Sequence, residues 1–117
     1  MNYEEFAKSR GLSLSEMGSS GVAFGKAAAL EALELLKQSN AVVLGGDVIA
    51  VKGETPQFNY DSWHFDPSDA EPASANSAAS IQTAVEYINK YPDPGDGSIM
   101  YARTIASREG SPQLKWD

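Results

Sequence analysis

The sequence predicts a small α+β domain in which helices pack on a three-stranded sheet that contains a β-hairpin. Apolar residues recur every three or four positions near residues 25–38 and 78–91, as they do in helices that bury one face. Residues 42–52 instead carry β-branched side chains at both odd and even positions, which is typical of a strand covered on both faces. A chain of 117 residues can build one hydrophobic core without disulfide bonds, so we expect a single domain over residues 1–117.

Two helices are predicted in the first third of the chain. Residues 2–10 form the first helix, because Asn2 suits the N-terminal cap and Gly11 ends the helical pattern. Residues 13–25, which are rich in Ser and Gly, connect it to the second helix. That helix, residues 25–38, has the sequence GKAAALEALELLKQ and consists almost wholly of residues with high helix propensity.

A β-hairpin is predicted to follow the second helix. Its first strand, residues 42–52, contains Gly45 and Gly46, which indicate a β-bulge or a close approach by another backbone. Regular alternation along this strand would place Val43 and Val48 on opposite faces of the sheet.

The second strand of the hairpin is predicted to lie at an edge of the sheet. A turn at residues 53–56 reverses the chain, and residues 58–65 return as a strand. Aromatic and polar side chains mix on both sides of this strand, so neither side is purely apolar. We therefore expect one of its faces to be exposed to solvent.

A third helix and a third strand complete the predicted fold. Residues 66–75 contain two prolines and three acidic residues and are predicted to form a loop. A helical stripe of apolar residues follows: Ala78, Ile81, Ala84, Val85, Ile88 and Tyr91. The segment PDPGDG at residues 92–97 ends this helix, residues 98–106 have the pattern of a strand, and residues 107–117 are predicted to be a loose tail. The predicted order is ααββαβ.

Negative charge is concentrated in the hairpin and in the loop after it. The whole chain has a formal net charge of −7. Residues 41–72 contribute −5 of this total, because Lys52 is the only cation among six acidic residues: Asp47, Glu54, Asp61, Asp66, Asp69 and Glu71. Such a field disfavours nucleic acid and anionic membranes and accelerates the encounter with a basic partner. The alternative is an acidic surface that only keeps the protein in solution.

The sequence contains no pattern that is typical of a catalytic centre. The chain has no cysteine, and His64 is its only histidine, which leaves little room for a catalytic triad. No spacing of ligands indicates a metal, and we expect no cofactor. The open alternative is a small-ligand-binding or hydrolytic domain that uses Asp47, Asp61 and His64 in a cleft.

The sequence also bears on location. The N-terminal residues lack the basic and apolar pattern of a signal peptide, and the apolar runs are too short to span a bilayer. We therefore expect a cytoplasmic protein without a membrane partner.

An ordered set of motifs resembles one family of bacterial proteins. A helix that ends in ELLK, residues 34–37, leads to LGGDV at residues 44–48, and the segment YDSWHFD follows at residues 60–66. Ser80 and the pair Tyr87-Ile88 lie in the later helix. In this order the motifs resemble family forty of the immunity proteins of bacterial polymorphic toxin systems. The resemblance covers residues 22–106.

The resemblance implies that the chain is an antidote that binds and blocks a toxin delivered by competing cells, without catalysing a reaction. The implied partner is a basic toxin surface, which carboxylates that imitate phosphate groups would attract. The implied partner-binding residues are Tyr60, Asp61, Trp63, Phe65, Asp66, Asp69 and Glu71. The family motif itself comprises Leu44, Gly45, Gly46, Asp47, Val48, Ser80, Tyr87 and Ile88.

Two of these residues also have a structural interpretation. Trp63 could pack beneath the second helix instead of contacting a partner. Asp47 could accept hydrogen bonds from backbone amides at the bulge.

Overall fold

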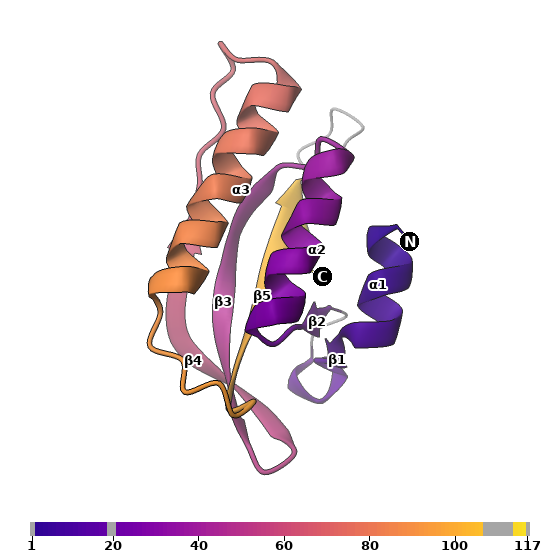
Figure 1. The fold of residues 1–117 in the computed structure, drawn as a ribbon, viewed down its shortest axis with the longest axis vertical. Helices are drawn as coiled ribbons and strands as arrows, with labels where there is room; N and C mark the ends of the chain where they lie inside the picture. The colour runs from indigo at the N-terminus through magenta and orange to yellow at the C-terminus, as the bar shows by residue number, and fades with distance from the viewer. Residues whose placement is uncertain (1, 19–20, 107–113, 117) are drawn as a thin grey trace.

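The computed structural model describes residues 2–18, 21–106 and 114–116 and shows helices packed against one face of an antiparallel sheet (Figure 1). The elements in chain order are α1 (Tyr3–Arg10), β1 (Leu12–Ser13), the 3-10 helix η1 (Ser15–Met17), β2 (Val22–Ala23), α2 (Lys26–Gln38), β3 (Val43–Lys52), β4 (Thr55–His64), α3 (Ala73–Lys90), β5 (Ile99–Ala106) and β6 (Leu114–Trp116). The predicted α+β class and the order of its main elements are confirmed. None of the helices in the described ranges is both long enough and apolar enough to cross a membrane.

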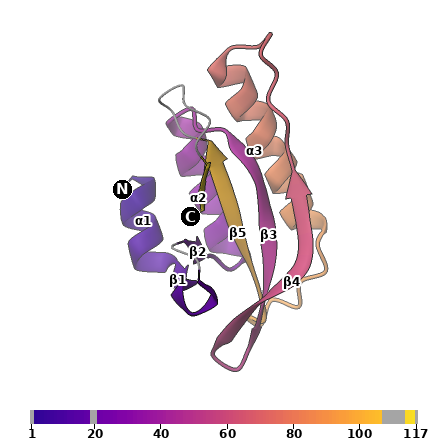
Figure 2. The same ribbon diagram turned by 180° about the vertical axis from the view of Figure 1, so that it is seen from behind.

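The main sheet has the strand order β4-β3-β5-β6, and every neighbouring pair is antiparallel. The strand β4 therefore forms one edge of the sheet, as the sequence predicts. Phe24, just after β2, pairs with Tyr101 on the other side of β5 through two backbone hydrogen bonds of 2.9 and 2.8 Å. Helices α2 and α3 lie side by side over one face, and the opposite view shows the strands in front of them (Figure 2).

Three short strands were not expected from the sequence. The strands β1 and β2 pair with each other within the predicted connection, and β6 pairs with β5. Leu114–Trp116 therefore form a strand where a loose tail is predicted, while residues 107–113 and 117 of that tail lie outside the described residues. A segment of two or three residues is too short to show the alternation by which strands are recognised.

The core lies mainly between the helices and the sheet. Helices α2 and α3 bury small and aliphatic side chains there: Ala28, Ala29, Ala32, Leu33, Leu36, Ile81, Ala84 and Ile88. Full burial of one large apolar side chain stabilises the fold by roughly 1.5–3 kcal/mol. A smaller cluster on the other face of the sheet joins Leu14 and Ala23 to Ile49 and Ala102.

Val43 and Val48 both face the helices, which corrects the prediction that they lie on opposite faces. Both are fully buried in the core beneath α2 and α3. The pairing of β3 with β5 shifts by one residue between Val43 and Gly45, so the alternation of side chains changes phase at this point. The predicted bulge is therefore present, and it turns one additional valine toward the core.

Two buried serines of α3 fix the start of β3. The Ser80 hydroxyl accepts a hydrogen bond from the Val43 N–H at 2.9 Å and donates one to the carbonyl of Ser77, also at 2.9 Å. The Ser77 hydroxyl donates to the carbonyl of Ala41 at 2.6 Å. The buried N–H of Val43 and carbonyl of Ala41 thus have hydrogen-bond partners on the side chains of α3. Ser80 of the family motif has a structural role here.

Gly45 and Gly46 allow Trp63 of β4 to lie directly against β3. Gly45 has a φ of 155°, which side-chain-bearing residues rarely adopt, and a Cβ at this position would overlap the Trp63 carbonyl. A Cβ on Gly46 would overlap both the Trp63 ring and the carbonyl oxygen of Ala102. The second interpretation of the Gly-Gly pair, a close approach by a neighbouring strand, is therefore also confirmed.

We expect Gly46→Ala to destabilise the protein by about 1–3 kcal/mol, because the added methyl group must displace either the tryptophan ring or the backbone of β5. Gly25→Ala is the matched control, since Gly25 has ordinary dihedral angles and no atom within 4 Å of its added Cβ. Chemical denaturation followed by circular dichroism measures both variants. Equal unfolding midpoints for the two variants would show that Trp63 does not press on Gly46 in solution.

Candidate functional site

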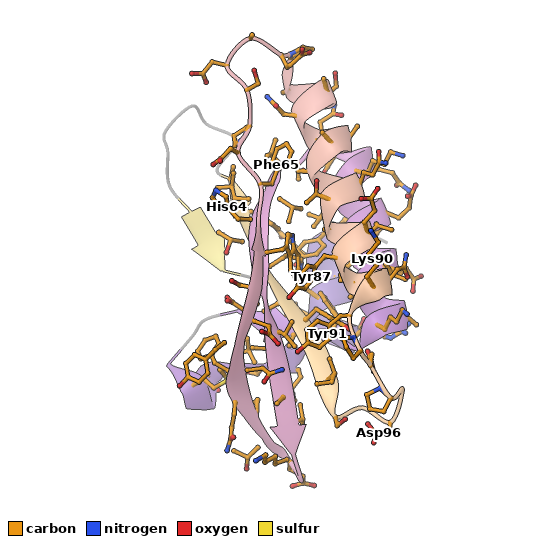
Figure 3. The ribbon with its side chains drawn as sticks, turned by 90° about the vertical axis from the view of Figure 1, so that its left-hand side faces the viewer. His64, Phe65, Tyr87, Lys90, Tyr91 and Asp96 are labelled. Carbon is orange, nitrogen blue, oxygen red and sulfur yellow. The ribbon has the colours of Figure 1, made fainter. Side chains whose placement is uncertain are left out.

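The exposed edge strand β4 carries three of the predicted partner-binding residues, Tyr60, Asp61 and Trp63, and the other four follow it in the chain. Asn59, Asp61 and Trp63 turn toward α3, because their side chains contact tyrosines of α3 or the residue that follows it. Phe65 continues this side, whereas His64 points to the opposite side of the sheet (Figure 3). This arrangement follows from the alternation of side chains along a strand. Asp61, Trp63 and Phe65 of the predicted set therefore lie on the same side of the edge, toward α3.

A row of aromatic rings connects β4 to α3 and then to β5. The ring centroids of Trp63 and Tyr87 are 5.0 Å apart, those of Tyr87 and Tyr91 are 5.8 Å apart, and those of Tyr91 and Tyr101 are 6.2 Å apart. Tyr87 and Tyr91 are neighbours because residues four apart share one side of a helical turn. We call these four residues the aromatic ladder. Figure 3 shows both labelled tyrosines between α3 and the sheet.

Trp63 is a structural residue as well as a surface residue. Its ring is half-buried, packs against the core cluster and contacts Tyr87 of α3. The sequence suggested packing beneath the second helix, whereas the ring contact is with Tyr87 of the third helix. Val48 and Ile88 of the family motif are buried in the same core.

The phenol of Tyr91 organises the polar part of the site. Its hydroxyl donates to Oδ2 of Asp61 at 2.6 Å and accepts a hydrogen bond from Nδ2 of Asn59, also at 2.6 Å. The hydrogen bond to Asp61, followed by partial burial and by the charge of Asp61, raises the pKa of Tyr91 from its ordinary 10.0 to about 12. Farther along the ladder, burial is the main factor that raises the pKa of Tyr101, whose hydroxyl donates to Asp93 at 3.0 Å.

The loop between β4 and α3 displays acidic side chains. Asp66, Asp69 and Glu71 are all exposed. Asn76 of α3 holds this loop, since its side chain accepts a hydrogen bond from the Ser68 N–H and donates one to the Ser68 carbonyl, both at 2.9 Å. The carboxylates therefore project from a backbone that is tied to the helix.

Tyr60 occupies a second bulge, on β4. One residue of β3, Val48, faces three residues of β4, because Asp47 pairs with Ser62 and Ile49 pairs with Phe58. Within this bulge Tyr60 has a left-handed φ of 63° and a side chain that is 94% exposed. Such a conformation costs a residue with a Cβ about 1–2 kcal/mol. The strand thus holds a large aromatic ring in solvent at an energetic cost.

Asp47 does not have the structural role that the sequence suggested. Its pairing with Ala102 places it on the face of the sheet opposite Trp63. Partial burial raises the pKa of its carboxyl group. Within the described ranges no hydrogen bond joins this carboxylate to the backbone amides of the bulge, because the glycines there bring strand β4 against β3 and leave the carboxylate on the opposite face.

The alternative site of Asp47, Asp61 and His64 is not assembled. Asp61 turns toward Tyr91, while Asp47 and His64 share the other face of the sheet by register. The Nε2 atom of His64 lies 2.7 Å from Oδ1 of Asp66, and both side chains are exposed. In the part of the chain that the structure describes, no group of three or more His, Cys, Asp or Glu side chains is placed to hold a metal ion.

Sequence reasoning missed the residues that hold the site together. Its central hydrogen bonds involve Asn59, Tyr91 and Asn76. The sequence predicted no role for the two asparagines, and it placed Tyr91 only in the apolar stripe of a helix. The spacing of Tyr87 and Tyr91 by four residues was the available signal, since it places two phenols on one side of a helix.

We expect Tyr91 to titrate about two pH units above an ordinary tyrosine in an ultraviolet absorbance titration, with Tyr91→Phe identifying its contribution. Because folding raises this pKa, the hydrogen bond stabilises the fold fully below pH 10 and ceases to do so as the pH rises through about 12. Asp61→Asn should move the pKa of Tyr91 toward its ordinary value, whereas Asp93→Asn, which removes the charged partner of Tyr101, should not. An unchanged Tyr91 titration in Asp61→Asn would exclude the hydrogen bond in solution.

Comparison with known proteins assigns most of the chain to a family. A family model described as Immunity protein 40 matches residues 13–105, which is most of the chain. Neither the curated proteins nor the solved structures include a significant match. The matched residues run from β1 to the end of β5 and include the Gly-Gly pair, the edge strand and the aromatic ladder. The chain therefore belongs to the Immunity protein 40 family.

Proposed function

We propose that this protein binds a specific toxin of a competing bacterium and blocks it without catalysing a reaction. Membership of an immunity protein family supports the toxin as the partner. The observation that carries the choice of surface is that an exposed edge strand and the loop after it hold aromatic and acidic side chains together. We define the acidic edge as Tyr60, Asp61, Trp63, Phe65, Asp66, Asp69 and Glu71. This surface would cover a basic region of the toxin.

Charge supports a basic partner. The acidic edge contains four carboxylates within eleven residues, and no cation lies among them. Opposite charge on two proteins accelerates their encounter and disfavours incorrect partners. Truncation of one member of a charge pair that is buried in an interface costs roughly 2–5 kcal/mol. These acids would therefore contribute both to the rate of toxin capture and to the lifetime of the complex.

The aromatic residues of the acidic edge have different proposed roles. Tyr60 is 94% exposed and would enter the interface as a protruding side chain. Trp63 and Phe65 are half-buried, so they would contribute only their outer edges. Asp61 is already held by Tyr91, and a group that is ordered before binding loses less entropy when the complex forms.

Among the residues that the structure describes, the candidate catalytic side chains are not brought together, which agrees with action by occlusion. The single histidine pairs with Asp66, and the carboxylates of Asp47 and Asp61 turn to opposite faces. A chain without cysteine needs no oxidising compartment, which agrees with action in the cytoplasm.

Co-expression with the toxin domain, which we expect in the reading frame beside this gene, tests the proposed function. We expect the protein to restore growth of cells that make this toxin and to form a complex with it in size-exclusion chromatography. A toxin that remains lethal and does not bind the purified protein would contradict the proposed function.

We expect neutralisation of Asp66, Asp69 and Glu71 as Asn, Asn and Gln to lower toxin affinity by about ten- to a hundredfold, mainly through slower association at low salt. The matched control neutralises three exposed acids on α1 and α2: Glu4, Glu31 and Glu34. Both variants change the net charge by +3, so an effect of total charge alone would appear in both. Surface plasmon resonance at several salt concentrations separates the two cases, and equal affinities would exclude the acidic loop as the interface.

We expect Tyr60→Gly to stabilise the folded protein by up to about 1 kcal/mol while it weakens toxin binding, because glycine adopts a left-handed φ without a Cβ clash. Tyr60→Ala is the control, since it removes the same ring but keeps the unfavourable backbone conformation. Thermal unfolding and toxin affinity are measured for both variants. If both bind the toxin as tightly as the natural protein, Tyr60 is outside the interface.

A further inference from the structure

The edge of the main sheet at β4 is open along part of its length. The strand β4 ends the order β4-β3-β5-β6, so its outer side lacks a neighbouring strand among the described residues. The Phe65 N–H donates to the carbonyl of Leu44 at 2.9 Å, which directs Phe65 toward β3. Backbone groups alternate in direction along an antiparallel strand, so the N–H and C=O groups of His64 and Ser62 point away from β3. With respect to the described residues, these groups form a row of unpaired donors and acceptors at the surface.

The lower part of this edge, residues 55–61, is blocked against the addition of another strand. The Val51 N–H donates to the carbonyl of Ser98 at 2.8 Å, so the backbone of Val51 is directed toward β5. The backbone N and C=O of its partner on β4, the buried residue Pro56, therefore point away from β3. Pro56 has no N–H to offer an incoming strand. The bulge at Tyr60, with its left-handed backbone, then interrupts the strand. Proline and bulges are the usual means by which proteins prevent strand addition at an edge.

The upper part, residues 62–65, has none of these protections. It contains neither a proline nor a bulge, and it ends in a loop that Asn76 ties to α3. Lysine, the other common protection, is also missing: no Lys or Arg occurs between Lys52 and Lys90, while six acidic residues do. The exposed acids Asp61 and Asp66 stand at the two ends of this short open segment.

We propose that the toxin adds an extended, positively charged segment to the sheet as a fifth strand beside Ser62 and His64. This inference rests on the proposed function and specifies how the toxin binds. Main-chain hydrogen bonds to the outward groups of Ser62 and His64 supply affinity, as in other cases of strand addition. Lysine or arginine side chains of the added strand face Asp61 and Asp66 at the ends of the segment. An open strand edge that carries no lysine or arginine therefore suits an added strand of positive charge.

His64→Pro and His64→Ala form the matched pair for the test. Both remove the imidazole and its contact with Asp66, but only proline removes the outward N–H and places its ring in the path of an added strand. The ladder with β3 is retained in both variants because the His64 N–H does not take part in it. We expect His64→Pro to bind the toxin domain about tenfold or more weakly than His64→Ala does.

Hydrogen exchange of the natural protein provides a measurement that does not depend on the folding of a variant. Nuclear magnetic resonance should show that the amides of Ser62 and His64 exchange rapidly in the free protein and are protected in the complex. Equal toxin affinities of the proline and alanine variants, or unprotected amides in the complex, would overturn strand addition. If the natural protein rescues growth and forms the complex while these amides stay unprotected, only strand addition is wrong. If no complex forms at all, the proposed function fails and strand addition fails with it.

Discussion

The contact between the Trp63 ring and the bare backbone of Gly46 is the constraint on which the arrangement of this protein depends. The edge of the indole lies over position 46 because this position has no side chain, and the ring also packs against Tyr87 of α3. One aromatic ring therefore contacts both β3 and the helix. A larger residue at position 46 would lift the tryptophan and separate α3 from the hairpin.

The aromatic ladder connects this contact to side chains at the surface. Tyr87 positions Tyr91 one helical turn later, and the Tyr91 hydroxyl holds both Asp61 and Asn59 of β4. The carboxylate at the centre of the acidic edge is thus fixed by side chains that also stabilise the core. A surface prepared in this way presents its charge in one geometry, which lowers the entropy that binding must overcome. The motif residue Ser80 lies deep in the fold because its hydroxyl is a hydrogen-bond partner for the buried backbone of Val43.

One half of the edge strand is protected against the addition of another strand, and the other half is open to it. This combination agrees with a binding role. The lower half of the strand has a proline and a bulge, whereas its upper half leaves backbone groups open beside exposed acids. The bulge holds Tyr60 in a backbone conformation that only a glycine adopts without cost. Folding gains nothing visible from an aromatic ring that is 94% exposed, so the benefit of this residue is expected in a complex.

The sequence by itself determined the α+β class, the main helices and strands, the edge position of β4 and the meaning of Gly45-Gly46, because these follow from local periodicity and from the steric freedom of glycine. It also identified the correct family through an ordered set of motifs. The face on which Val43 lies, the separation of Asp47 from Asp61 and the role of Tyr91 were decided only by the tertiary structure. A bulge changes which side chains share a face, and a hydrogen bond between residues thirty positions apart has no local signature in the sequence.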